Sequence, residues 1–226
     1  MKFRNELKYI VDEATLFEIE HRISTVLKRD VHQKGNSYNI RSIYFDDVFN
    51  TCMKDNAMGV DRREKYRIRV YDKSSNLIKA EIKGAVQGKH YKRAAILTKD
   101  DFNNILELKP STVLETQSKD KQLFVSAIVS KGMRQKTLVE YERTCYVTPL
   151  GNVRITFDRN INASTKYENI FSDSINGIPV MKKGYHILEV KYDEFIPAYL
   201  THLLELGTLQ RTSFSKYYIA RQKSYI

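Results

Sequence analysis

Residues 63–72 of the sequence read REKYRIRVYD, and residues 79–84 read KAEIKG. Both stretches carry charged side chains at every second position: Lys65, Arg67 and Arg69 in the first, and Lys79, Glu81 and Lys83 in the second. Side chains of a β-strand alternate between its two faces, so each charged set projects to one side at intervals of about 6–7 Å. The intervening residues are mostly apolar and would pack against covering structure. The charged face therefore meets either water or an anionic ligand.

The same alternation recurs in three further segments that read as strands. Its members there are Arg4, Glu6 and Lys8; Arg154, Thr156 and Asp158; and Glu189, Lys191 and Asp193. In an ordinary half-exposed antiparallel sheet such a face would simply be solvated. Recurrence on several strands instead favours an antiparallel barrel with a charged lumen, because such a barrel can enclose a ligand channel. We predict an α+β fold in which an antiparallel β-barrel of about eight strands forms a charged tunnel, with helices packed outside.

Local signals place the remaining elements. Hairpin turns are expected at KSSN (73–76) and PLG (149–151). Asp12 is expected to cap an amphipathic helix, Thr98 and Asp101 to cap a second helix, and a longer helical stretch is expected after Pro110, with Leu114 on its apolar side. No repeats or linker-like tracts interrupt the chain, which indicates one domain over residues 1–226.

The overall charge narrows the class of partner. The formal net charge is +11, from 38 Lys and Arg against 27 Asp and Glu. Such an excess favours nucleic acid, a membrane surface or phosphorylated metabolites as partners, without choosing among them. No apolar stretch is long enough for a membrane span, and the first residues lack the apolar core of a signal peptide. Cys52 and Cys145 are isolated and are expected to be free thiols, so we expect a cytoplasmic location.

Six motifs in a fixed order carry a family resemblance. They are FRNELKY (3–9), KYRIRVY (65–71), AEIK (80–83), EYER (140–143) with RITFD (154–158), LEVKYD (188–193) and FSKY (214–217). Together they resemble the catalytic domain of VTC-type (vacuolar transporter chaperone) polyphosphate polymerases, within the CYTH-like superfamily of triphosphate tunnel metalloenzymes. The related adenylate cyclases and thiamine triphosphatases usually begin with Glu-x-Glu-x-Lys. Here Arg4 occupies the first position, as in the polymerase branch.

The resemblance implies a reaction and a set of residues. The γ-phosphoryl of ATP would pass to a polyphosphate chain inside a basic tunnel, with Mn²⁺ or Mg²⁺ as cofactor. Carried over by motif, the catalytic residues would be Arg67, Arg69, Lys83, Arg143 and Arg154. Phosphate-binding residues would be Lys8, Tyr141 and Lys216, to which the strand alternation adds Arg4 and Lys191. Glu189, with Glu6 nearby, would hold the metal.

For several residues the sequence allows two interpretations. Lys92 and Arg93 are adjacent, so only one can face the tunnel, and we expect Arg93 to do so and to bind phosphate. Glu81 could assist the metal or could hold Lys79 or Lys83 in a salt bridge. Asp46 and Asp47 could be metal ligands, although a strand-end turn is the favoured interpretation. Arg41 could face the lumen or lie on the surface.

Three functional hypotheses follow from this reading. The first is a polyphosphate polymerase-like enzyme that binds ATP and polyphosphate or triphosphate. The second is a triphosphatase that hydrolyses inorganic or organic triphosphate, and the third is a non-catalytic polyphosphate-binding module. Ser213 replaces a lysine of the fungal polymerase pattern and bears on the third hypothesis. Nucleic acid is not expected as a partner, because no RNP, zinc-finger or helix-turn-helix motif is present, and no protein partner is indicated.

Overall fold

A computed structural model of the chain describes residues 4–87, 89–109, 113 and 117–224. One antiparallel sheet dominates it, and eight strands follow one another across this sheet. In spatial order they are β1 (Asn5–Asp12), β10 (Tyr185–Tyr192), β8 (Val153–Ser164), β7 (Arg134–Thr148), β3 (Tyr38–Asp46), β4 (Arg63–Tyr71), β5 (Ser74–Val86) and β6 (Lys89–Leu97). The short strands β2 (Lys28–Arg29) and β9 (Ile178–Pro179) pair with β7 and β8. The predicted α+β class and the main path of eight strands are confirmed.

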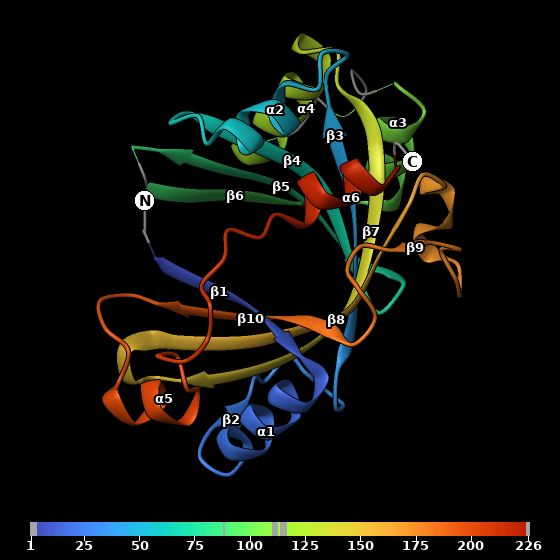
Figure 1. Cartoon of the computed structure of the whole chain (residues 1–226). Coiled ribbons are helices and arrows are strands. Elements are labelled where there is room, and N and C mark those ends of the chain that lie inside the picture. Colours follow the sequence, from blue (N-terminus) through green and yellow to red (C-terminus); the bar gives the residue numbers. More distant parts are fainter. Residues whose placement is uncertain (1–3, 88, 110–112, 114–116, 225–226) are drawn as a thin grey trace.

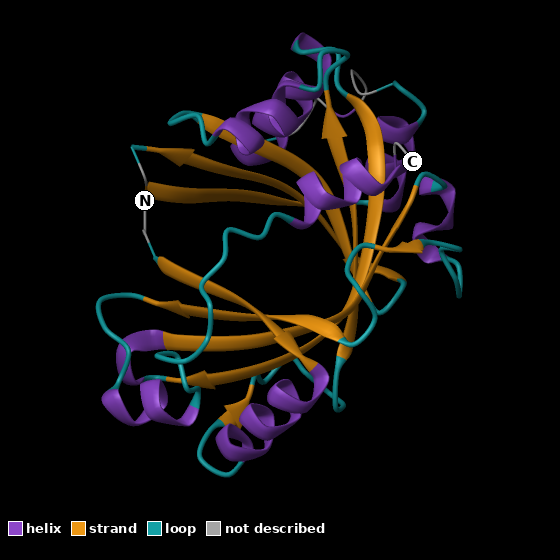
Figure 2. Cartoon of the chain, viewed as in Figure 1, coloured by secondary structure: helices purple, strands orange, loops and turns teal. Residues whose placement is uncertain are grey.

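The sheet is strongly curved, so that its two ends face each other (Figures 1 and 2). β1 and β6 form the two ends of the strand order, and within the described residues no hydrogen-bonded ladder joins them. Side chains and a loop bridge this seam instead. The Lys83 ammonium lies 3.2 Å from the Glu6 carboxylate across the seam. The Thr212 N–H donates to the Lys8 carbonyl at 2.9 Å, which ties the loop before α6 to β1.

Helices cover the outside of the curve, as predicted, except the last helix, which begins at the lumen with Lys216 and stacks Tyr217 on the inward-facing Tyr44 (Figure 2). α1 (Glu13–Ser24) and α5 (Ala198–Leu203) lie over β1, β8 and β10 and share a hydrophobic cluster with them. α2 (Thr51–Met58), α3 (Lys99–Leu106), α4 (Lys119–Ser130) and α6 (Lys216–Ser224) pack around the other arm of the sheet. None of these helices is long and apolar enough to cross a bilayer.

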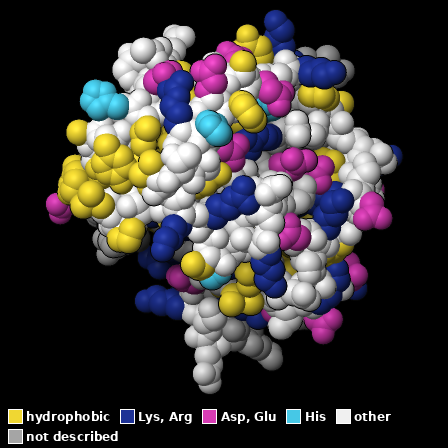
Figure 3. All heavy atoms as spheres, turned by 90° about the horizontal axis from the view of Figure 1, so that it is seen from below, with side chains coloured by type: hydrophobic (Ala, Val, Ile, Leu, Met, Phe, Trp, Pro, Cys, Tyr) yellow, Lys and Arg dark blue, Asp and Glu magenta, His cyan; other side chains and the backbone are white. Residues whose placement is uncertain are grey.

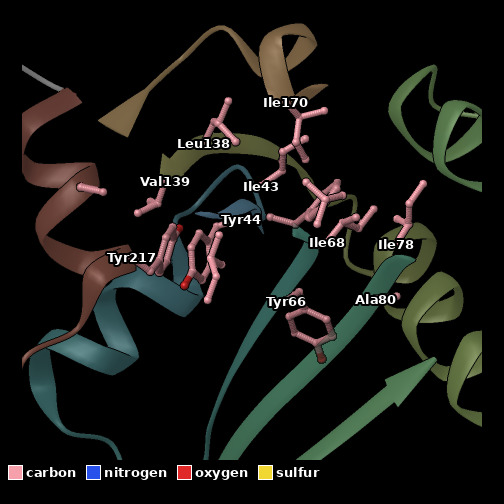
Figure 4. Packing of buried hydrophobic residues seen from close by; sticks show 14 of the residues in the cluster. Ile43, Tyr44, Tyr66, Ile68, Ile78, Ala80, Leu138, Val139, Ile170 and Tyr217 are labelled. Carbon is pink, nitrogen blue, oxygen red and sulfur yellow. The ribbon is translucent and has the colours of Figure 1, made fainter. Parts of the chain in front are cut away.

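The larger hydrophobic cluster explains why the charged residues of β4 and β5 face inward. Ile68 lies between Arg67 and Arg69 in the sequence, and it packs with Ile43 and Ile78 on the outer face of the sheet, with all three essentially inaccessible to water (Figure 4). Burying each such side chain contributes about 1.5–3 kcal/mol, and a one-residue shift of a strand would expose the whole set. The apolar face thus fixes the direction of the charged one.

Three local predictions can be compared with the structure. Asp12 caps α1, and Thr98 with Asp101 forms a capping box at α3, as expected. The hairpin turn between β4 and β5 lies at Asp72–Lys73 rather than at residues 73–76, because both turn residues adopt positive φ (49° and 57°), as a two-residue type I′ turn requires. The helix expected after Pro110 begins only at Lys119, and Pro110 and Leu114 lie outside the described residues.

Arg41 lies neither in the lumen nor on the surface, so both interpretations of it are wrong. Its guanidinium is fully buried on the outer face of β3, where it pairs with Glu140 and donates to the carbonyls of Asn169 and Ile170. A buried charge needs this full set of partners. Arg41 therefore anchors the 3₁₀ segment Tyr167–Phe171 to the sheet.

Asp46 ends β3 and caps the following helix, as the turn interpretation predicted. Its carboxylate accepts from the backbone N–H groups of Cys52 and Met53 at 2.9 and 3.0 Å, and from the Tyr217 hydroxyl at 2.6 Å. Tyr217 in turn stacks on Tyr44, with ring centroids 5.0 Å apart (Figure 4). Asp46 thus connects α2 and α6 to the sheet.

Replacing Asp46 with alanine should lower the free energy of unfolding by about 2–4 kcal/mol, because three buried donors lose their acceptor. The matched control is Asp47→Ala, which removes an exposed acceptor of Thr51 and should cost only about 1 kcal/mol. Urea denaturation with and without Mn²⁺ measures both. A loss at Asp46 that appears only in the presence of Mn²⁺ would contradict the capping role.

Candidate functional site

Three adjoining cavities follow one another along the inside of the curved sheet. A wide cavity of about 660 Å³ opens at the end of the tunnel near Tyr38, Tyr71 and Arg154. A constriction of about 90 Å³ lies in the centre. A third cavity of about 460 Å³ opens at the other end, near Arg63 and Arg211. Along β4 the lining runs in order through these cavities, so the strand direction and the tunnel direction agree.

The central constriction brings together nine residues that the sequence predicted. They are Lys8, Arg67, Arg69, Lys83, Tyr141, Arg143, Glu189, Lys191 and Lys216. They come from five different strands and from α6, so they converge only because the sheet curves round. Arg4, Glu6 and Arg154 line the adjoining wide cavity. The inference that the alternating charges face one another across a lumen is therefore supported by geometry.

Cations lie directly opposite cations on neighbouring strands. Lys65 pairs in register with Lys83, and Lys83 with Lys92, so β4, β5 and β6 place three lysines in one row. Arg69 faces Lys79 in the same way. Like charges at facing positions destabilise a sheet. This arrangement is typical of a surface that binds an anion rather than of one selected for stability.

Buried carboxylates hold the central arginines in place. Glu81, which is inaccessible to water, accepts from the Arg67 Nε at 2.6 Å and pairs with Lys92. Asp158 accepts hydrogen bonds from Nε and Nη2 of Arg143, at 2.6 and 2.7 Å. It also forms an ion pair with Lys216 at 2.5 Å. Glu81 is thus a structural partner of Arg67, and not of Lys79 or Lys83 as the sequence suggested.

Two tyrosine hydroxyls complete the central wall. Arg69 donates to the Tyr141 hydroxyl at 3.1 Å, and Arg67 donates to the Tyr44 hydroxyl at 3.2 Å. Lys216 also lies 4.8 Å from the centre of the Tyr141 ring. These contacts orient the guanidinium groups without neutralising them.

Glu6 and Glu189 lie on neighbouring strands and share two lysines. Lys8 lies 2.5 Å from Glu6 and 3.9 Å from Glu189, and Lys191 lies 3.8 and 3.3 Å from the same two groups. Burial and the nearby Glu189 raise the pKa of Glu6, but Lys83, Lys8 and Lys191 outweigh them and bring it to about 2. Burial also opposes ionisation of Glu189, yet Lys191, Lys8 and Arg143 hold its pKa well below its usual range. Both groups are carboxylates at neutral pH.

This carboxylate pair fits a hard divalent cation. Mg²⁺ and Mn²⁺ prefer oxygen ligands, and Mg²⁺ is commonly held by one or two carboxylates together with substrate phosphates. Within the described chain no group of three or more metal-ligating side chains occurs. Phosphate oxygens and water would therefore supply the remaining ligands.

Arg93 does not face the tunnel, which corrects the sequence expectation. It points to the outer face of β6, where it pairs with Asp120 of α4 at 3.2 Å. Lys92 faces inward instead and lines the wide cavity. The register of β5 and β6 determines which of the two side chains faces the lumen, because Lys92 lies opposite the inward-facing Lys83 and Arg93 lies opposite the outward-facing Ile82.

Lys65 is the least compensated of the described cations that line the central constriction. Its ammonium donates to the Ser215 hydroxyl at 3.1 Å, and among the described residues no carboxylate forms an ion pair with it. Burial lowers the pKa of Lys65 most, and the neighbouring Lys83 and Lys8 lower it further, to about 7. Burial likewise lowers the pKa of Lys83 to about 8, although Glu6 works in the opposite direction.

Sequence reasoning missed several lining residues. Tyr44, Ser215 and Lys92 were not assigned to the site, and Asp158 was noted only as part of the charge alternation. Lys92 could have been found from its position opposite Lys83 across the expected hairpin turn. Tyr44 and Ser215 carry no signal in the sequence, because hydroxyls occur at many positions in strands and loops.

Comparison with protein families identifies the fold. The model of the VTC domain matches residues 3–225, nearly the whole chain. The chain belongs to the VTC domain family. Membership implies a triphosphate-tunnel enzyme that uses a divalent metal. No curated protein matches the chain.

Solved structures share the fold of this VTC domain at low sequence identity. A candidate adenylate cyclase from Bacillus halodurans superimposes with a TM-score of 0.55 at 13% identity, over 95% of this chain and 94% of its own. The PH1819 protein from Pyrococcus horikoshii gives a TM-score of 0.52 at 13% identity, over 97% and 99%. Similarity at this level supports the fold alone.

Binding of tripolyphosphate at about pH 8 should be accompanied by proton uptake. An anion beside Lys65 raises its pKa from about 7, so the ammonium regains a proton on binding, and affinity should fall as the pH rises from about 7 to about 9. Titration calorimetry in buffers of different ionisation enthalpy counts the protons.

Lys65→Arg separates this effect from titration of the ligand itself, because arginine stays protonated in both states. It should remove up to about one proton of uptake and leave binding intact. Lys119→Arg, at an exposed position on α4, is the matched control. Equal uptake in all three proteins would contradict a titrating Lys65.

Proposed function

We propose that this VTC domain transfers the γ-phosphoryl group of ATP to the end of a polyphosphate chain inside the tunnel. The observation that carries the proposal is the surplus of cations in the central constriction. Eight Lys and Arg side chains line it, and the carboxylates that form ion pairs with them among the described residues are Glu6, Glu81, Asp158 and Glu189. A linear phosphate chain supplies the missing negative charge at regular intervals along the same axis.

The two open ends favour a chain over a compact ligand. The cavities on both sides of the constriction are lined by further cations, including Arg63 and Arg211 on one side and Arg154 on the other. A donor triphosphate and an acceptor chain can therefore meet at the centre from opposite directions. A site for hydrolysis alone would require only one such entrance.

The residues of the constriction have distinct tasks in this reaction. Arg67 and Arg69 would bind the non-bridging oxygens of the transferred group, where charge develops. Their guanidinium groups are already oriented by Glu81 and by the two tyrosine hydroxyls, so little reorganisation is needed when substrate binds. Arg143, held by Asp158, and Lys216 would bind the neighbouring phosphates.

Glu6 and Glu189 would hold the divalent metal. Bound there, Mg²⁺ or Mn²⁺ would neutralise charge on the phosphates of the donor. The bond between the γ-phosphorus and the β–γ bridging oxygen breaks, ADP leaves with that oxygen, and a terminal oxygen of the chain forms the new bond. That oxygen is already anionic at neutral pH, so the chain needs no general base.

Arg69→Ala should lower the rate of polyphosphate synthesis by about 10²–10³-fold, because it removes a donor to the transferred group. The assay contains ATP, Mn²⁺ and a short polyphosphate primer, and chain length is followed on gels. Glu189→Gln should lower the rate similarly and should raise the Mn²⁺ concentration needed for half-maximal activity.

Arg93→Ala is the matched control, since it removes the same side chain from the outer face of the sheet, and it should leave the rate unchanged within about twofold. Unchanged activity in both Arg69→Ala and Glu189→Gln would overturn the site. Release of orthophosphate without longer chains would indicate a triphosphatase. Tight binding without turnover would indicate a polyphosphate-binding module.

Tripolyphosphate should raise the melting temperature by about 5–10 °C when present at about 100 times its dissociation constant. The ligand binds only the native tunnel, where it relieves repulsion among the lysines. Differential scanning fluorimetry measures the shift, which should shrink with added salt because the interaction is ionic. A shift that is the same in Arg67→Ala and in the wild type would contradict binding in the tunnel.

A further inference from the structure

The two mouths of the tunnel are lined by different chemistry. Aromatic and apolar side chains face the wide cavity, among them Tyr38, Ile40, Tyr71 and Leu77. The opposite mouth is lined mainly by cations, hydroxyls and backbone of the loop before α6. Among the described residues that line this second mouth, the only tyrosine or phenylalanine ring is that of Phe214, which is 5% exposed. A polyphosphate chain has no aromatic or apolar group that could pack against the side chains of the first mouth.

The aromatic rings of the wide mouth form a pair. Tyr38 on β3 and Tyr71 on β4 lie on the same inward face, because Tyr71 is in register with Ile40, two residues from Tyr38. Their ring centroids are 6.3 Å apart with an angle of 39° between the planes. Both side chains are half-buried and line the cavity, so part of each ring is open to it.

Cations connect this pair to the phosphate path. Arg154 donates to the Tyr38 hydroxyl at 3.5 Å, and the Lys79 ammonium lies 5.6 Å from the centre of the Tyr71 ring. On β4, one two-residue repeat separates Tyr71 from Arg69, and a second repeat separates Arg69 from Arg67. A ligand with a flat ring on Tyr71 thus carries its phosphates over two arginines at intervals of about 6–7 Å.

We propose that Tyr38 and Tyr71 form a stacking site for the base of a nucleoside triphosphate, so that the donor enters through this mouth and the phosphate chain leaves through the other. The proposal rests on the proposed function, and it adds the position and direction of the donor. Stacking on tyrosine does not depend on the hydrogen-bonding edge of a base. The site therefore favours nucleotides over tripolyphosphate analogues without a base, and it accepts ATP and GTP alike.

Binding of two ligands to one variant tests the site. Tyr71→Leu keeps an apolar side chain of similar reach but removes the ring. Calorimetry with the non-hydrolysable β,γ-imido analogue of ATP and Mg²⁺ should give a dissociation constant raised about fivefold or more, since base stacking on an aromatic ring typically contributes at least that factor. The dissociation constant for tripolyphosphate should stay within about twofold of wild type. Tyr71→Phe, which keeps the ring, should bind both ligands as wild type does.

Matched controls keep the outcome interpretable. Tyr38→Leu should behave as Tyr71→Leu does, whereas Tyr199→Leu makes the same change on α5, at a residue 40% exposed, and should alter neither constant. Equal weakening of both ligands by Tyr71→Leu, or no effect on either, would overturn the stacking site and leave the proposed function standing. If the wild type binds neither ligand, the proposed function is refuted, and the stacking site with it.

Discussion

Three lysines that face one another across β4, β5 and β6 set the constraint to which the rest of the tunnel adapts. Lys65, Lys83 and Lys92 occupy one row of the sheet, where directly opposed like charges repel, and partial burial of Lys65 and Lys83 weakens the screening of their charges by water. The chain relieves this repulsion only in part. Glu6 pairs with Lys83 and Glu81 with Lys92, whereas Lys65 has a serine hydroxyl as its described partner. The positive charge that remains is concentrated where the cavities lie.

On the face of the molecule viewed in Figure 3, positive charge is not concentrated as it is in the tunnel. There, Lys and Arg side chains are interspersed with Asp and Glu. A nucleic-acid-binding surface usually gathers its cations on one face or along one groove. The central constriction of the lumen, by contrast, is lined by eight Lys and Arg side chains. An anion inside the tunnel would therefore meet a denser cluster of cations than one on this face.

The sequence predicted the inward-facing residues of β4 well and those of β6 poorly, for one physical reason. In β4 the isoleucine and valine between the charges fix which face is apolar, so Arg67 and Arg69 could be assigned without knowing any partner strand. In β6, Lys92 and Arg93 are adjacent and both charged, so the face depends on the register across the preceding turn. A shift of one residue exchanges the two faces. That register is a property of the hairpin and not of the segment itself.

Long-range partners explain the other differences. Arg41 is held by Glu140 and by carbonyls near residue 170, more than 95 residues away along the chain, and no local pattern announces such partners. β3 is buried on both faces along most of its length, so it lacks the alternation of apolar and polar residues that would have placed Tyr44. The sequence therefore predicts those side chains whose orientation a single strand determines, and it fails for those whose environment is assembled by the curvature of the sheet.

The seam between β1 and the opposite arm extends this argument to the closure of the tunnel. A hydrogen-bonded ladder would close the sheet through backbone groups alone. Here the Glu6–Lys83 ion pair and the contacts of the loop before α6 close it, and Glu6 and Lys83 also line the cavities. The pKa of Glu6, about 2, keeps its carboxylate ionised throughout the neutral range, and the pKa of Lys83, about 8, leaves most of its partner protonated at about pH 7. Because the charges that close the tunnel also face its contents, an anion inside neutralises the repulsion that the seam has to withstand, so closure of the fold and occupancy of the site are thermodynamically linked.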